Sequence, residues 1–92
     1  MVYNIRSVVY WHRFDPAEWD IEYDIDELAA HQVYEVEAAE VIWNGFAVRP
    51  NARRHGPNRY QILGRTDGGR PLKLIVHVSG ERKMRVITGW QI

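Results

Sequence analysis

The chain has 92 residues, of which 46% are hydrophobic, and it carries no net charge at neutral pH. We therefore expect residues 1–92 to form one small domain with a compact core and not a globally disordered chain. The absence of cysteine excludes disulfides, Cys-ligated zinc and thiol catalysis. Since no apolar run reaches the roughly 20 residues of a membrane span and no signal peptide pattern begins the chain, we expect a soluble cytoplasmic protein of bacterial type.

The N-terminal segment predicts a strand followed by a turn. Met1 to Trp11 alternates between apolar and polar side chains, which is typical of a strand at the edge of a sheet. Pro16 fixes its own φ and disfavours helix at Asp15, so the chain is expected to turn there.

Two helices are predicted between residues 20 and 44. The first uses Asp20 as its N-cap and runs to about His31. The second runs from Glu35 to Asn44 and ends at Gly45. The expected buried stripe of the first helix is Ile21, Ile25 and Leu28. The expected inner face of the second is Val36, Ala38, Ala39, Ile42 and Trp43.

The C-terminal half predicts an antiparallel sheet. Phe46 to Arg49 is expected to form a short strand, and Asn51 to Asn58 an exposed polar loop. Arg59 to Gly89 predicts three strands joined by tight turns at Asp67-Gly68-Gly69 and Gly80-Glu81-Arg82, in which glycine supplies the positive φ. The expected fold is therefore α+β, with two short helices packed on one face of an antiparallel sheet of about four strands.

The hairpins determine which side chains share a face of the sheet. Gln61 should lie opposite Ile75, Ile75 opposite Ile87, and His77 opposite Arg85. One face is then nearly all apolar and must be covered; it carries Tyr60, Ile62, Leu72, Leu74, Val76, Val78, Met84, Val86 and Trp90. The other face carries Gln61, Leu63, Arg65, Lys73, Ile75, His77, Arg85 and Ile87.

Charge is distributed unevenly along the chain. Asp15 to Glu40 contains ten acidic residues and no Lys or Arg, whereas Val41 to Ile92 contains ten basic residues and only Asp67 and Glu81 as acids. A basic half favours a polyanionic partner. The alternative is that acidic helices and a basic sheet neutralise each other within the fold.

The cationic face is the candidate functional surface. Arg65, Lys73, His77 and Arg85 share it with no carboxylate, and cations on adjacent strands repel one another. A phosphodiester would relieve this repulsion, because Arg pairs with two oxygens, Lys supplies a point charge and His exchanges a proton near neutral pH. The alternative is an ordinary solvated sheet face.

Other candidate residues are less specific. Arg53 and Arg54 in the polar loop and Arg59 at its border are, together with Lys73, the candidate contacts for a nucleic acid. Tyr60 is a candidate for base stacking, although core packing is favoured for it. The four histidines are widely spaced, so no element offers two metal ligands, and we expect neither a metal nor another cofactor.

Two segments resemble a known family. AAHQVYEVEAAEVIWN (Ala29 to Asn44) and RYQILGRTDGGRPLKLIVHV with RKMRVITG (Arg59 to Gly89) resemble the BrnT-type toxins of bacterial type II toxin–antitoxin systems. The resemblance covers roughly Trp19 to Thr88. It implies a RelE-like α+β fold, metal-independent cleavage of RNA, and neutralisation by a cognate antitoxin, which we expect to be a ribbon-helix-helix protein.

The resemblance also implies roles for individual residues. Arg65 and Arg85 match the family's two arginines in the central and last strands, and His31 matches its His before the second helix. Cleavage would use the RNA 2′-hydroxyl as nucleophile, with Arg65 and Arg85 stabilising the phosphorane. His77 or Tyr60 would transfer the proton, which is an inference from the residues and not from the family.

Two other functions stay open at the level of sequence. One is a non-catalytic module on the same scaffold that binds nucleic acid or protein. The other is a structural domain that forms a homodimer when its first strand pairs edge to edge with a second copy.

Overall fold

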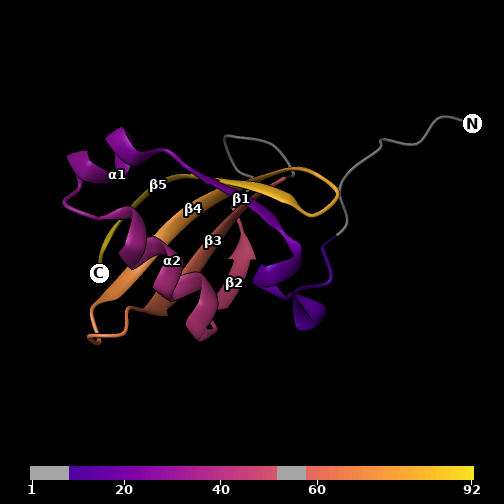
Figure 1. Ribbon diagram of the computed structural model, residues 1–92, viewed down its shortest axis with the longest axis horizontal. Helices are drawn as coiled ribbons and strands as arrows, with labels where there is room; N and C mark the ends of the chain where they lie inside the picture. The colour runs from indigo at the N-terminus through magenta and orange to yellow at the C-terminus, as the bar shows by residue number, and fades with distance from the viewer. Residues whose placement is uncertain (1–8, 52–57) are drawn as a thin grey trace, which may run out of the picture.

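The computed structural model describes residues 9–51 and 58–92 and shows two helices packed on one face of a five-stranded mixed sheet (Figure 1). The helices are α1 (Ile25–Ala30) and α2 (Glu35–Asn44), preceded by 3-10 turns at Trp11–Arg13 and Pro16–Glu18. The strands are β1 (Asp20–Tyr23), β2 (Ala47–Pro50), β3 (Arg59–Arg65), β4 (Pro71–Gly80) and β5 (Lys83–Gln91). The sheet order is β1-β5-β4-β3-β2. The α+β class is confirmed, but the antiparallel sheet of four strands is wrong, because β1 adds a fifth strand parallel to β5.

Strand β1 replaces the first turn of the predicted helix. Ile21 and Tyr23 alternate with acidic residues, and this period of two is typical of a strand. The spacing of four between Ile21 and Ile25 is typical of a helix, so the sequence fits both structures equally well. Pairing with β5 decides the outcome. Where this pairing begins, the Asp20 N–H donates to the carbonyl of Arg82, the residue just before β5, at 2.8 Å. The helix begins only after Asp24, whose side chain caps it, and Ile25 is consequently 54% exposed.

The segment before β1 forms no strand in the part that is described. Of the predicted strand Met1 to Trp11, residues 1–8 lie outside the described ranges, and Trp11 begins a 3-10 turn. Aromatic side chains from this segment pack on the sheet beyond the end of α2. The Trp11 and Tyr60 rings lie 5.1 Å apart, and those of Phe14 and Phe46 lie 5.5 Å apart.

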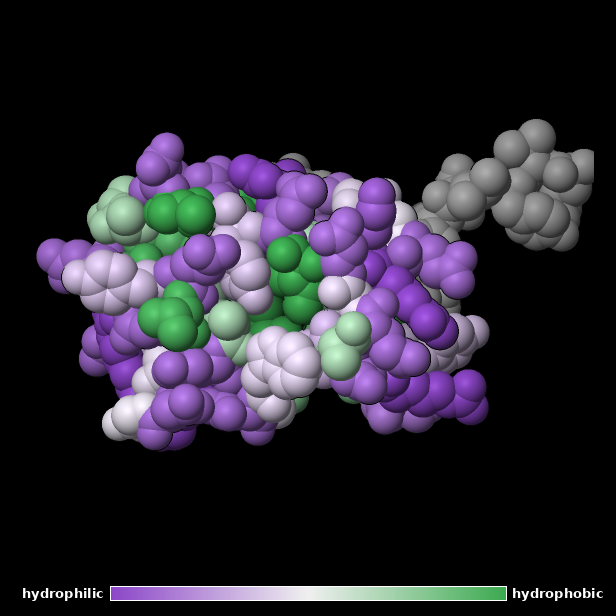
Figure 2. Space-filling view, viewed as in Figure 1, coloured by the Kyte–Doolittle hydropathy of each residue, from purple (hydrophilic) through white to green (hydrophobic). Residues whose placement is uncertain are grey.

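Helix α2 has the predicted bounds, but its buried face is rotated from the expected one. Ala38, Val41 and Ile42 are buried against the sheet. Val36 and Trp43 are 61% and 59% exposed, because residues seven apart share a helix face and this face points away from the sheet. Apolar residues on this side appear as separate patches among hydrophilic ones (Figure 2). Neither helix in the described ranges is long and apolar enough to cross a membrane.

The first hairpin forms as expected, whereas the pairing of β4 with β5 shifts at two places. One shift is at the second turn, where Gly80 pairs with Lys83 and so does not belong to the turn, and the other is an irregularity beside Ile75 and Val76. Gln61 lies opposite Ile75 and His77 opposite Arg85. Gly69 has the expected positive φ of 89°, but in the second turn the residue with positive φ is Arg82 and not glycine. Strand β2 starts one residue later than predicted.

The irregularity is a bulge in β5 that changes which residues face the helices. Ile75 lies opposite Thr88, so Ile87 is an extra residue without a partner on β4. Beyond the bulge, Gly89 faces Leu74 on the covered side, and Trp90 moves to the open side. The expectation that Trp90 lies on the covered face is therefore wrong.

Gly89 explains why the bulge fits the core. A Cβ at this position would lie 2.6 Å from Leu74 Cδ2 and 3.3 Å from Leu28 Cδ2 of α1. The bulge thus puts a residue without a side chain where α1 meets β5. The fully buried side chains form one cluster between helices and sheet: Leu28, Val33, Ala38, Val41, Ile42, Ile62, Leu72, Leu74, Val76, Val78, Met84 and Val86.

Candidate functional site

The sheet face turned away from the helices carries the predicted cations. Residues directly opposite each other on neighbouring strands project from the same face. The register therefore places Arg65, Lys73, His77 and Arg85 together on the open side, as the sequence predicted.

These cations do not form one cluster. Arg65 lies opposite Pro71, six residues before His77 on β4, so the two are about 20 Å apart at roughly 3.3 Å per residue. This separation exceeds the combined reach of two side chains. Arg65 instead donates to the Gly69 carbonyl within its own hairpin, at 2.9 Å. The expectation that Arg65 and Arg85 stabilise the same phosphorane is therefore wrong.

Three strands bring a smaller set of side chains into one row. Arg59 on β3 lies opposite His77 on β4, which in turn lies opposite Arg85 on β5. Neighbouring strands are about 4.8 Å apart, so the backbones of the two arginines flank that of His77 at about this distance on either side. Arg59 was expected to bind RNA from the loop border. The predicted register, with Gln61 opposite Ile75, already implied that Arg59 lies opposite His77 and therefore in this row.

The middle of the row is electrostatically unusual. Burial, and then the positive charge of Arg59, lower the pKa of His77 from its ordinary value of 6.5, so the imidazole is neutral at pH 7. In the described part of the chain, three buried polar atoms here have no hydrogen-bond partner: Asn58 Oδ1, Arg59 Nε and His77 Nδ1. Buried polar groups normally have partners, so these three atoms lack the hydrogen bonds that usually offset the cost of burial.

Arg85 is compensated by carboxylates that the sequence did not place beside it. Strand β1 puts Glu22 opposite Arg85, with Arg85 Nη1 and Glu22 Oε2 3.1 Å apart, and Asp24 Oδ2 lies 3.5 Å from Nη2. The expectation of a face without acids is thus wrong at this end. Such exposed pairs contribute about 0–1 kcal/mol each, so a phosphate can compete for the guanidinium.

The other predicted site residues lie apart from the row. Lys73 pairs with Trp90, and its Nζ lies 5.9 Å from the centre of that ring. Tyr60 lies on the covered face in the aromatic cluster, so its expected contact with RNA has no support from its position. Arg53 and Arg54 lie outside the described residues.

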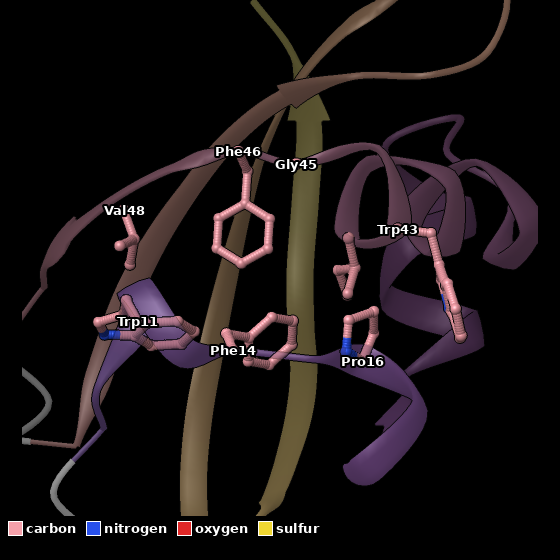
Figure 3. A pocket seen from close by; sticks show the side chains of 8 residues that line it. Trp11, Phe14, Pro16, Trp43, Gly45, Phe46 and Val48 are labelled. Atoms are coloured by element: carbon pink, nitrogen blue, oxygen red, sulfur yellow. The ribbon is translucent and has the colours of Figure 1, made fainter.

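An apolar pocket lies on the opposite side of the sheet (Figure 3). It encloses about 210 Å³ between the N-terminal 3-10 turns and the end of α2. Its lining is Trp11, Phe14, Pro16, Ile42, Trp43, Gly45, Phe46 and Val48. With no ionisable side chain in this lining, the pocket suits an apolar group but offers no catalytic one.

The described ranges also contain no group of three His, Cys, Asp or Glu side chains placed to hold a metal ion. The row of Arg59, His77 and Arg85 is therefore the arrangement with the clearest chemistry. No protein-family model matches the sequence, and searches of curated proteins and of solved structures found no match either.

Proposed function

We propose that this protein is a ribonuclease toxin of the BrnT type, with a RelE-like fold, that cleaves RNA in the bacterial cytoplasm without a metal ion. The observation that carries the proposal is the row of Arg59, His77 and Arg85 on neighbouring strands of the open sheet face. Burial and the charge of Arg59 lower the pKa of His77 in this row. Two helices packed on one face of a sheet support it, because the resemblance implies an α+β fold.

The row supports a specific reaction. His77 removes the proton of the RNA 2′-hydroxyl, a role that requires the neutral imidazole. The 2′-oxygen forms a bond to the adjacent phosphorus, the bond to the 5′-oxygen breaks, and the leaving oxygen takes a proton from water. The products are a 2′,3′-cyclic phosphate and a free 5′-hydroxyl. Arg59 and Arg85 donate hydrogen bonds to the other phosphate oxygens and stabilise the phosphorane.

Arg65 and Lys73 have a different role in this proposal. They lie on the same face but further along the strands than the row. Their charges attract neighbouring phosphates and so contribute to RNA affinity, not to the chemical step.

RNA binding without cleavage is the second candidate function. The observation that favours it is the pairing of Arg85 with Glu22 and Asp24, which lowers the positive potential where the phosphorane would form. Both candidates use the same surface, so only the chemical step distinguishes them.

The test is incubation of purified protein with single-stranded RNA in the presence of a metal chelator. We expect fragments that end in 2′,3′-cyclic phosphate. The substitution His77→Ala should lower the cleavage rate by roughly 10²- to 10⁴-fold, the usual contribution of a general base, with little change in RNA affinity.

Arg65→Ala is the matched control for Arg59→Ala, because both remove one guanidinium from the same face. Arg65→Ala should weaken RNA binding but leave the cleavage rate of bound RNA unchanged, whereas Arg59→Ala should lower both. Binding without cleavage by the unaltered protein would establish the second candidate, and absence of binding would refute both.

The toxin assignment has its own test in cells. Induced expression should arrest growth, and His77→Ala should abolish the arrest. Co-expression of a cognate antitoxin, which we expect to be a ribbon-helix-helix protein, should restore growth. Arrest that persists in the His77→Ala variant would contradict the assignment.

A further inference from the structure

The bulge at Ile87 gives the open face an aromatic side chain. Without it, Trp90 would project toward the helices, as the sequence pattern predicts. With it, Trp90 lies directly opposite Lys73, and Lys73 lies opposite Leu63 on β3. Trp90 therefore shares a face with the row of Arg59, His77 and Arg85.

Trp90 has no place in the hydrophobic core. Trp11 and Trp19 pack against the buried cluster, but Trp90 is not among the side chains that do. It is only partly buried, and the charged Nζ of Lys73 lies 5.9 Å from its ring centre. A tryptophan beside a cation on an open sheet face provides a flat surface on which a nucleobase can stack, with a positive charge for the phosphate.

Helix α1 borders this surface at the β5 edge. The Thr88 hydroxyl lies 3.3 Å from Glu27 Oε1, to which it donates, and His31 Nε2 lies 3.5 Å from the same oxygen. The ring of His31 lies 6.0 Å from that of Trp90. Polar groups that can contact the edge of a base thus lie at one side of the indole.

We propose that Trp90 and Lys73 form a subsite for one nucleotide of the bound RNA, a role that rests on the proposed function. The base stacks on the indole in place of the Lys73 ammonium, which moves to pair with the phosphate. Lys73 and His77 are four residues apart on β4, about 13 Å at roughly 3.3 Å per residue. The stacked base therefore belongs to a neighbouring nucleotide and not to the one whose 2′-hydroxyl reacts.

Two probes separate stacking from charge. The first is a short 2′-O-methyl oligoadenylate, which cannot be cleaved by attack of a 2′-hydroxyl, and the second is the same backbone without bases. We expect the unaltered protein to bind the first probe more tightly. Trp90→Ala should weaken binding of the first probe by roughly 5- to 150-fold, the loss of one stacked base, and leave the second unchanged. Trp90→Phe should retain most of the affinity because it keeps a ring.

The matched control is Trp43→Ala, which removes an exposed tryptophan from the opposite side of the sheet. It should change the affinity for neither probe. Lys73→Gln should weaken both probes and reduce the slope of log affinity against log salt by about 0.7, the value for one phosphate contact on a single strand.

Two results would overturn the subsite. If Trp90→Ala binds both probes as the unaltered protein does, the cationic row alone binds RNA, and the proposed function stands without the subsite. If the unaltered protein binds neither probe, the proposed function fails, and the subsite fails with it. Quenching of tryptophan fluorescence by the first probe, lost in Trp90→Phe, gives an independent readout in a variant that keeps a ring at this position.

Discussion

Substitution of Gly89 by Ala tests the β5 bulge most directly. A Cβ built there lies 2.6 Å from Leu74 Cδ2, 3.0 Å from the Lys73 carbonyl oxygen and 3.3 Å from Leu28 Cδ2. Leu74 and Leu28 are fully buried and have little room to move. The Lys73 carbonyl belongs to the backbone of the neighbouring strand and cannot shift without disturbing the pairing.

The size of the effect follows from two opposing contributions. Forcing an extra carbon into a well-packed core costs about 1–3 kcal/mol. Replacing glycine by alanine in a strand returns roughly 0.5–1 kcal/mol, because the unfolded chain loses less backbone freedom. At the middle of these ranges the net loss in free energy of unfolding is about 1 kcal/mol, which for a domain of this size lowers the Tm by roughly 4–8 °C.

Thermal and urea unfolding followed by circular dichroism measure this loss. The matched control is Gly68→Ala in the first hairpin, where the nearest atom to the added Cβ is Thr66 Oγ1 at 3.9 Å. That variant should stay within about 0.5 kcal/mol of the unaltered protein. If Gly89→Ala is as stable as the control, Gly89 does not lie beneath α1. The bulge would then be misplaced, and Trp90 with it.

Three further predictions concern charge and packing. Arg59→Gln should raise the pKa of His77 toward its ordinary value, since burial alone would then lower it; an NMR titration of the imidazole measures this, and an unchanged pKa would exclude the influence of Arg59. Burial raises the pKa of Glu37, but hydrogen bonds from a backbone N–H and from Arg70 outweigh burial and lower this pKa below its ordinary value of 4.5. The ionised Glu37 side chain therefore stabilises the fold above pH 4.5, and this contribution is lost as the pH falls through the lowered pKa. Glu37→Gln should therefore flatten the acid side of the stability curve in urea unfolding, and a curve of unchanged shape would contradict this. Gly64→Ala should lower the free energy of unfolding by about 1 kcal/mol, because the added Cβ would lie 2.9 Å from a valine methyl of α2, and a variant of normal stability would show that α2 can shift.

Much of the candidate site could be predicted from the sequence. The hairpin turns set the register, and the register placed His77 opposite Arg85 on the face away from the helices. The distance between Arg65 and His77 was also implied by that register, since strand length grows by a fixed rise per residue. The carboxylates beside Arg85 were not predictable in this way, because Glu22 reaches it only through a strand pairing across some sixty residues of chain.

The sequence by itself determined the features that depend on neighbouring residues. Helix α2 with its stop at Gly45, the two hairpins and the alternation of β3 and β4 follow from turn residues and from periods of 3.6 and 2, which act over short stretches of chain. Only the tertiary structure decided that Asp20 to Tyr23 is a strand and that β5 bulges at Ile87. Both depend on distant partners, since β1 requires the edge of β5 and the bulge accommodates Leu28 above Gly89. Local pattern is ambiguous at these two places, and the packing between distant segments selects one of its outcomes.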